Sequence, residues 1–282
     1  MGELSKIQWT DNTFNPWRGC EKVSPACMNC YAAAGSLRNP KVLGEWGRGS
    51  KRVIGTDKYW KKPLSWNAQA EAEGRRIKVF CLSYGDVFED RADLIPHRTR
   101  LFSLIEQTPY LDWLLLTKRP HIAARWALAL QSAGREWPRH AWIGATVERQ
   151  VEAEERLPWL TRVPAPVRFL SCEPLLGPLD LQPWLWTKQT GDSGAWTGFY
   201  DQPRGGLHWI IAGGESGPGA RLTRLEWLIG LKEQARVSGV PFFMKQTGKV
   251  LGRRLGDSTP KGDDMSTWPR GLQQRAFPVV SP

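Results

Sequence analysis

The chain has 282 residues, 41% of them hydrophobic, and a formal net charge of +11 at pH 7. This length and apolar content allow a substantial core, and the excess of basic residues favours an anionic partner such as nucleic acid. No apolar run has the length of a membrane span or resembles a signal peptide, so the sequence argues against a membrane protein and favours a cytoplasmic one.

Three of the five cysteines lie close together, at Cys20, Cys27 and Cys30, with the spacing C-x6-C-x2-C. Ser24 followed by Pro25 is typical of the start of a helix. We therefore expect Cys27 and Cys30 on one helical face, with Cys20 folding back from the preceding loop. Three converging sulfurs would result.

Three thiolate ligands suit two kinds of metal site. A structural zinc ion needs a fourth protein ligand, for which His97 and His121 are candidates. A four-iron, four-sulfur cluster held by three cysteines leaves one iron open for an exogenous ligand, and chemistry can take place there. The residues alone leave both sites open. A disulfide is disfavoured because Cys81 and Cys172 lie inside apolar runs and no export signal is visible.

Short apolar segments recur along the chain and predict β-strands. They cover residues 6–10, 78–83, 112–118, 141–147, 167–172, 207–213 and 241–246. Helical periodicity occupies the gaps at residues 98–107, 121–134, 148–160 and 224–238. This alternation predicts an α/β fold, in which a parallel sheet of six to seven strands forms a partial (β/α) barrel.

We expect the barrel over residues 1–250, with two insertions, and an irregular tail over residues 251–282 that wraps the barrel or trails from it. The insertion at residues 41–66 mixes tryptophans with Lys and Arg. Such a mix can stack bases and hold phosphates, and equally its tryptophans can pack on the barrel. The Trp- and Gly-rich insertion at residues 183–206 is a candidate lid or a disordered segment.

Barrels place their working residues at the C-terminal ends of strands, and polar clusters follow six of the predicted strands. Loops often begin with polar residues, but the repetition favours a site. The candidates are Ser83, Gly85, Asp86, Lys118, Glu148, Cys172, Glu173, Gly213, Gly214, Glu215 and Lys245. The glycines would let backbone amides approach a ligand, and Glu215 could grip an amino group or ribose hydroxyls. Cys172 is a candidate catalytic hydrogen donor, whereas Cys81 is expected in the core.

Seven sequence blocks carry a resemblance to a known family. They are Trp9-Thr10-Asp11, Asn15-Pro16-Trp17-x-Gly19-Cys20, Lys22-Val23-Ser24-Pro25-x-Cys27-x-x-Cys30-Tyr31-Ala32, and residues 116–120, 173–178, 213–221 and 245–246. Together they resemble the phage-associated three-cysteine family of radical S-adenosylmethionine-like proteins. A more distant similarity is to spore photoproduct lyase, a radical enzyme that repairs a thymine dimer in DNA.

The resemblance implies a partial (β/α) barrel that binds a [4Fe–4S] cluster and S-adenosylmethionine. In such enzymes the open iron chelates the methionine moiety, and an electron from the cluster cleaves the sulfonium to a 5′-deoxyadenosyl radical that takes hydrogen from the substrate. Carried onto this chain, the cluster ligands are Cys20, Cys27 and Cys30. The contacts to the methionine end are Ser83, Gly85 and Asp86. The contacts to ribose or substrate are Glu148, Glu173, Gly213, Gly214 and Glu215.

The chain departs from the usual pattern of these enzymes in two places. Most of them have C-x3-C-x2-C, whereas the first gap here has six residues, so the loop must bulge. An aromatic residue usually precedes the third cysteine. Here Asn29 stands there, and Tyr31, just after Cys30, is the candidate cofactor contact.

The sequence thus predicts a radical S-adenosylmethionine enzyme that modifies or repairs a nucleic acid or nucleotide. It would need a reducing electron donor, and a partner protein is a further candidate. The alternative is a non-catalytic nucleic-acid- or partner-binding protein with a structural zinc site. A carboxylate-based barrel hydrolase is a third class.

Overall fold

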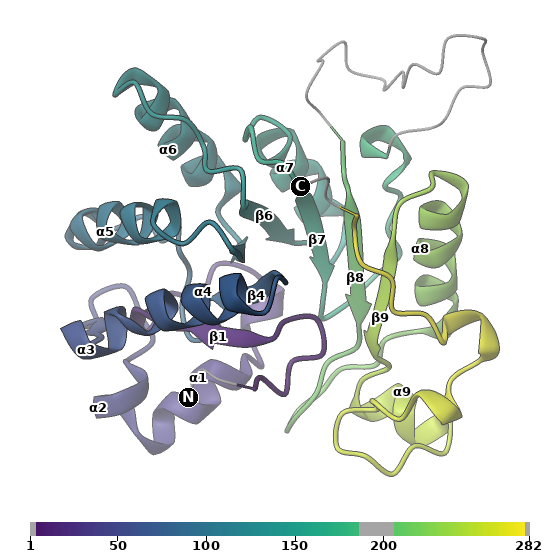
Figure 1. Ribbon diagram of the computed structural model, residues 1–282. Helices are drawn as coiled ribbons and strands as arrows, with labels where there is room; N and C mark the ends of the chain where they lie inside the picture. The colour runs from purple at the N-terminus through teal and green to yellow at the C-terminus, as the bar shows by residue number, and fades with distance from the viewer. Residues whose placement is uncertain (1–3, 186–205, 280–282) are drawn as a thin grey trace, which may run out of the picture. The chain divides into compact units, whose positions relative to one another are not determined.

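The computed structural model describes residues 4–185 and 206–279 of the chain (Figure 1). Seven strands form a sheet in the order β1-β4-β5-β6-β7-β8-β9, and the strand pairs described below are parallel. Apart from the short antiparallel pair of β2 and β3, each strand neighbours the strand that follows it in the chain. This is the order of a partial (β/α) barrel, so the predicted fold class is confirmed. The chain divides into two compact units, residues 1–144 and 145–282, which we describe separately.

Unit 1 contains the first strands of the sheet. They are β1 (Asn12–Phe14), β4 (Ile77–Cys81), β5 (Leu111–Thr117) and most of β6 (Ala141–Thr146), which crosses the boundary between the units. Asn12 pairs with Val79, and Ile77 pairs with Leu111. The helices after β4 and β5 are α5 (Ile95–Glu106) and α6 (Pro120–Ser132). Between β1 and β4 lie β2 (Trp17–Arg18), α1 (Tyr31–Arg38), α2 (Pro40–Leu43), β3 (Val53–Ile54), α3 (Asp57–Trp60) and α4 (Lys62–Ala72).

Unit 2 contains the remaining strands. They are β7 (Arg168–Cys172), β8 (Trp209–Gly213) and β9 (Phe242–Gln246), with α7 (Gln150–Leu160), α8 (Leu225–Val237) and α9 (Lys249–Arg254). Phe169 pairs with Trp209, and Ile210 pairs with Phe242. All five residues of β7 and all five of β8 are buried, as expected for parallel strands that are covered on both faces.

The C-terminal tail lies along β9. The Met244 amide donates to the Gln274 carbonyl at 2.9 Å, and the Ala276 amide donates to the Phe242 carbonyl at 3.0 Å. Beyond α9 the tail has two short 3-10 turns, Met265–Thr267 and Arg270–Leu272. The predicted irregular tail, residues 251–282, begins inside α9, so its first four residues are helical.

Six predicted strands and all four predicted helices are confirmed, with small differences at their ends. The prediction of a first strand at residues 6–10 is wrong, because β1 begins at Asn12. Residues 6–10 form a turn, in which the Thr10 hydroxyl donates to the carbonyls of Asn12 and Lys78. Trp9 is buried in this turn, so the apolar signal came from packing and not from a strand.

The predicted insertion at residues 41–66 contains α2, β3, α3 and the beginning of α4. Trp60 and Trp66 are 2% and 3% exposed, and their rings meet Phe14 edge-on at centroid distances of 5.7 and 6.4 Å. Their burial excludes base stacking on these two rings and confirms the alternative of packing for them. Trp46, the third tryptophan of this insertion, is half-buried, and its backbone bridges to Cys20. The other predicted insertion, residues 183–206, lies almost entirely outside the described residues.

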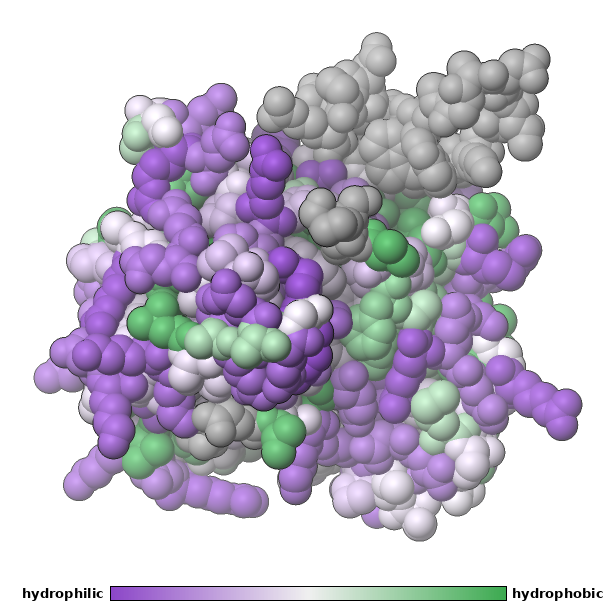
Figure 2. All heavy atoms as spheres, viewed as in Figure 1, coloured by the Kyte–Doolittle hydropathy of each residue, from purple (hydrophilic) through white to green (hydrophobic). Residues whose placement is uncertain are grey.

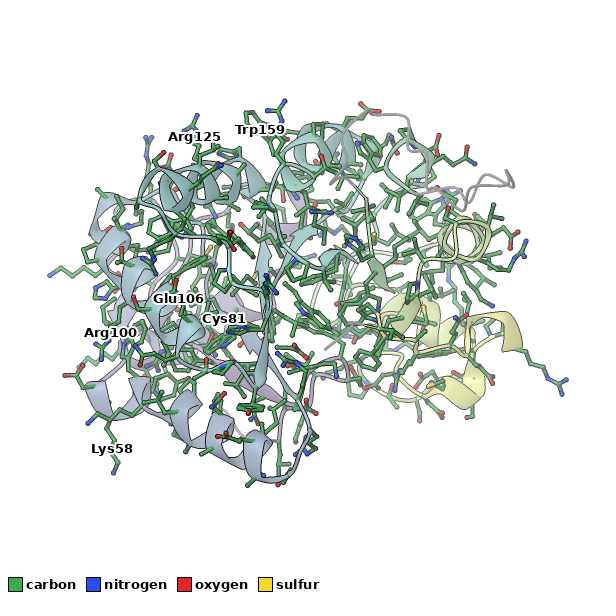
Figure 3. All side chains as sticks on the ribbon, turned by 45° about the horizontal axis from the view of Figure 1, so that its top comes forward. Lys58, Cys81, Arg100, Glu106, Arg125 and Trp159 are labelled. Carbon is green, nitrogen blue, oxygen red and sulfur yellow. The ribbon has the colours of Figure 1, made fainter. Side chains whose placement is uncertain are left out.

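The surface of unit 1 is hydrophilic where α3 and α5 face the viewer in Figure 2. Lys58 and Arg125 extend outward, whereas Cys81 lies inside and is fully buried, as predicted for a core cysteine (Figure 3). Among the helices of residues 4–185 and 206–279, none is both long enough and apolar enough to cross a bilayer.

One glycine in the middle of α8 and one just after it give opposite predictions. A methyl group added at Gly230 or at Gly239 would meet no atom within 4 Å, but Gly230 is helical and Gly239 has a φ of +66°. We expect Gly230→Ala to raise the free energy of unfolding by about 0.5–1 kcal/mol. Gly239→Ala should lower it by about 1 kcal/mol. Urea denaturation of both variants tests this, and changes of the same sign would contradict it.

His208 predicts a pH dependence of stability. Its Nδ1 accepts a hydrogen bond from the Arg168 amide at 3.0 Å, and burial followed by the charge of Arg168 lowers its pKa to about 4. The unfolded chain, with an ordinary histidine pKa, binds more protons between these values, so stability falls as the pH drops from about 6.5 to about 4. His208→Asn keeps an acceptor but does not titrate. Its unfolding free energy should therefore fall less between pH 7 and pH 5, by about 2 kcal/mol.

Candidate functional site

The three cysteines lie on one loop of unit 1, residues 19–31, which we call the cysteine loop. A 3-10 turn begins after Ser24, as predicted, but it ends at Cys27. Cys30 has an extended backbone (φ −59°, ψ 120°) and precedes α1. The prediction that Cys27 and Cys30 share a helical face is therefore wrong, because the chain leaves the helical conformation between them.

All three cysteines are free, and Cys27 is buried while Cys20 and Cys30 are half-buried. Reduced thiols on one loop suit a thiolate-bound metal by donor type. Within the described parts of the chain, however, no three His, Cys, Asp or Glu side chains are grouped closely enough to hold a metal ion. The cysteine loop does not gather its sulfurs as expected, so binding would require it to draw them together. Metal binding itself stays a prediction.

The cysteine loop is fixed to the C-terminal ends of β4 and β5. The Gly19 amide donates to the Tyr84 carbonyl at 2.9 Å, and the Tyr31 hydroxyl donates to the Ser83 carbonyl at 3.0 Å. From β5, Arg119 Nη2 donates to the Glu21 carbonyl at 3.2 Å. The structure thus brings the cysteines and the polar residues after β4 to the same edge of unit 1, as the sequence predicts.

The turn after β4 is built on Asn15. Its Nδ2 donates to Ser83 Oγ at 3.0 Å, and its Oδ1 accepts from the Tyr84 amide at 2.8 Å. Leu82, just before this turn, has a φ of +63°, a left-handed conformation that non-glycine residues rarely adopt and that is often found at functional sites. A methyl group added at Gly85 would lie 3.3 Å from the Gly19 carbonyl, so the glycine allows the cysteine loop to approach.

Asp86 is a buried junction between β4 and β5. It accepts from the Thr117 hydroxyl at 2.6 Å, from Arg119 Nη1 at 2.9 Å, and from the amides of Phe88 and Lys118 at 2.9 and 3.1 Å. Burial acts to raise its pKa, but Arg119 and these donors outweigh it and hold the pKa below its usual value. The candidate contact of Asp86 with the methionine moiety stays a prediction, and these four donors already occupy its oxygens.

Arg119 also lies beside Cys20. Burial, followed by the charges of Asp86 and Glu89, raises the pKa of Cys20 to about 12, and Arg119 and Lys118 oppose this only in part. Cys20 is therefore a protonated thiol in the chain alone. A bound cation would favour its thiolate, because a coordinated thiol gives up its proton.

A second buried ion pair, between Arg52 and Glu89, stabilises the segment that contacts the cysteine loop. Arg52 Nε and Nη2 donate to the two carboxylate oxygens of Glu89 at 2.9 and 2.6 Å, and each side chain is 1% exposed. Arg52 also donates to the carbonyls of Glu45, Gly47 and Ser50. The Gly47 amide in turn donates to the Cys20 carbonyl at 3.0 Å.

In unit 2, Glu148 and Cys172 are fully buried. Glu148 Oε2 accepts from Arg156 Nη1 at 2.8 Å, and that nitrogen also donates to the Thr146 carbonyl. Burial, and then the charge of Glu148, raises the pKa of Cys172 above its usual value, so it is a protonated thiol. The catalytic role of Cys172 stays a prediction.

The other candidates of unit 2 follow β7, β8 and β9. Both carboxylate oxygens of Glu173 accept from Lys245 Nζ at 2.7 Å. Glu215 accepts from the amide and the guanidinium of Arg221, which closes the glycine-rich loop on itself. A methyl group added at Gly214 would lie 2.2 Å from the Thr247 carbonyl, so this glycine is required by backbone packing against the end of β9.

Sequence reasoning missed four residues that position the cysteine loop: Asn15, Arg52, Glu89 and Arg119. Arg119 and Asn15 lie inside the sequence blocks that carry the family resemblance, and Arg119 follows the candidate Lys118. Their positions directly after β5 and β1 could have identified them as site residues. Arg52 and Glu89 lie 37 residues apart, and no spacing rule connects them.

Removal of Arg52 should destabilise unit 1 strongly. Arg52→Ala leaves the Glu89 carboxylate buried without its cation, and we expect the free energy of unfolding to fall by about 3–5 kcal/mol. Arg236→Ala is the matched control, because Arg236 pairs with Glu233 on an exposed helix face and should leave stability nearly unchanged. Urea denaturation measures both variants, and equal effects would contradict the role of the buried pair.

Comparison with known proteins gives one match. The model of the family "Protein of unknown function (DUF5131)" matches residues 4–268. No curated protein and no solved structure matches the chain. The match covers most of the chain, including the cysteine loop and the strand ends of both units, and the protein therefore belongs to the DUF5131 family.

Proposed function

We propose that this protein is a radical S-adenosylmethionine enzyme whose Cys20, Cys27 and Cys30 hold a [4Fe–4S] cluster. The observation that carries the proposal is the attachment of the cysteine loop to the C-terminal ends of β4 and β5, through Tyr84, Ser83 and Arg119. In parallel (β/α) folds this edge of the sheet is where catalytic groups lie. When bound, the cluster and S-adenosylmethionine would supply reductive cleavage of the sulfonium and a carbon radical that abstracts hydrogen.

The residues of the chain would hold and orient these groups. The Arg119 guanidinium, fixed by Asp86, lies beside Cys20 and would offset the negative charge that three thiolates bring to the loop. Tyr31 is 55% exposed, and its hydroxyl is tied to the Ser83 carbonyl, so its ring is oriented at the start of α1. The backbone turn at Ser83 and Gly85 is the candidate contact for the methionine moiety.

The proposed substrate class is a nucleic acid or nucleotide. It is supported by the net charge of +11, and the buried Trp60 and Trp66 play no part in it. A cytoplasmic location is part of the same proposal, since five reduced cysteines suit a reducing compartment.

The test is anaerobic reconstitution with iron and sulfide, followed by reduction in the presence of S-adenosylmethionine. We expect roughly four irons per chain, the brown absorbance of a [4Fe–4S] cluster and formation of 5′-deoxyadenosine. Cys27→Ala should lose the cluster, because two thiolates remain. Cys81→Ala removes a fully buried thiol of β4 that is not on the cysteine loop, and it should keep the cluster.

The same experiment judges the alternative of a structural zinc site. One tightly bound zinc ion and no iron after anaerobic purification would replace the proposal with a zinc-stabilised binding protein. A full cluster in Cys27→Ala would show that the ligands are assigned wrongly. An activity that survives loss of all three thiols would instead favour a carboxylate-based hydrolase.

A further inference from the structure

An exposed apolar surface adjoins the cysteine loop. Met28 lies between Cys27 and Cys30 and is 64% exposed, and Leu37, on the outer face of α1, is 87% exposed. The other large apolar side chains exposed here are Val23, Tyr31 and Val42. We call these five residues the α1 surface. Val23, Met28 and Tyr31 lie on the cysteine loop, and Leu37 and Val42 lie on the two helices that follow it. Grouped exposed apolar residues mark interaction sites more often than scattered ones do.

The α1 surface belongs to one locally packed structure. The buried side of α1 carries Ala32 and Ser36, which leaves Leu37 and Arg38 pointing outward. α1 and α2 pack against each other, and Arg18 Nη1 donates to the Val42 carbonyl at 2.8 Å. Figure 2 shows small apolar areas among hydrophilic ones where Figure 1 places these two helices.

Exposed basic side chains are frequent on the segment that carries this surface. Residues 22–51 contain five exposed basic side chains and one exposed acidic side chain, Glu45. The basic residues are Lys22, Arg38, Lys41, Arg48 and Lys51. Lys22 lies at the cysteines themselves, since its Nζ donates to the Met28 carbonyl at 3.3 Å. An apolar centre with a basic rim fits a partner that has an apolar patch and an acidic rim.

The chemistry of the surface favours a protein partner over a nucleic acid. Four of its five apolar side chains are aliphatic or Met, and Tyr31 is the one aromatic ring among them. Nucleic-acid surfaces instead combine basic residues with several aromatic rings on which bases stack. Of the candidate rings, Trp60 and Trp66 are buried, and Trp46, whose backbone bridges to Cys20, is half-buried.

We propose that the α1 surface docks a small acidic electron-carrier protein, which delivers the electron that the cluster requires. This inference rests on the proposed function, because an iron–sulfur cluster that gives up one electron in each reductive cleavage must be reduced again from outside. The surface begins at the cysteines, so a carrier bound there lies next to them. Encounters between redox proteins use small, weakly bound and electrostatically steered interfaces, and the exposed basic side chains of residues 22–51 supply positive charge for such steering.

The test uses a small acidic flavodoxin as the carrier and dithionite as the reductant that needs no docking. At low ionic strength, Arg38→Glu/Lys41→Glu should slow cluster reduction by reduced flavodoxin roughly tenfold, because electrostatic steering is lost. Reduction by dithionite should not change. The difference should largely vanish at about 1 M salt. Leu37→Ser should slow the flavodoxin reaction at both salt concentrations, because it removes apolar contact.

Arg125→Glu/Arg139→Glu is the matched control. It makes the same charge change at exposed positions of unit 1, on α6 and before β6. It should keep the rate of the parent chain. Equal slowing in the two charge variants would overturn the proposal, because the effect would then come from net charge alone.

Failure of the proposed function can be told apart from failure of the docking surface. If no cluster forms, the proposed function falls, and the affinity of the cluster-free chain for flavodoxin still decides the docking. Loss of affinity in Arg38→Glu/Lys41→Glu supports the surface, and absent or unchanged binding overturns it. If this variant instead loses binding to a DNA duplex and keeps flavodoxin, the surface serves nucleic acid and the proposal is wrong.

Discussion

The buried ion pair between Asp86 and Arg119 determines how unit 1 presents its cysteines. Placing a carboxylate and a guanidinium in the interior costs solvation free energy, which geometry and further hydrogen bonds must offset. Here the Thr117 hydroxyl and two backbone amides complete the shell of Asp86, and Arg119 continues to the Glu21 carbonyl and to Cys20. One guanidinium therefore fixes three segments that are far apart in sequence: the end of β4, the end of β5 and the cysteine loop.

The sheet was predictable because burial on both faces leaves a simple signal. β5 and β8 read as continuous apolar runs, and their limits follow from those runs. β1 escaped because its three residues, Asn12, Thr13 and Phe14, are mostly polar. The short helices between β2 and β4 escaped because Pro and Gly divide them into pieces too short for helical periodicity to show.

The positions of the candidate site residues could be predicted from the sequence, but the partners of their side chains could not. Carboxylates stand after β4, β7 and β8, as the sequence indicates, but each is paired with a basic side chain: Asp86 with Arg119, Glu173 with Lys245, and Glu215 with Arg221. Two of these partners lie 33 and 72 residues away, and only the folded chain shows which basic residue each carboxylate meets. Part of the positive charge that suggests an anionic partner is thus neutralised within the protein.

The tail along β9 has a consequence for how the protein avoids self-association. β9 is the last strand of the sheet, and an uncovered outer strand offers unpaired amides and carbonyls to any other extended chain. Residues 274–276 occupy those groups on Phe242 and Met244, and Arg275 lies over the ring of Phe243 at 5.6 Å. Residues 274–276 thus protect β9 from edge-to-edge aggregation. A chain shortened before Gln274 would keep every strand of the sheet but would leave the backbone groups of β9 free to pair with another chain.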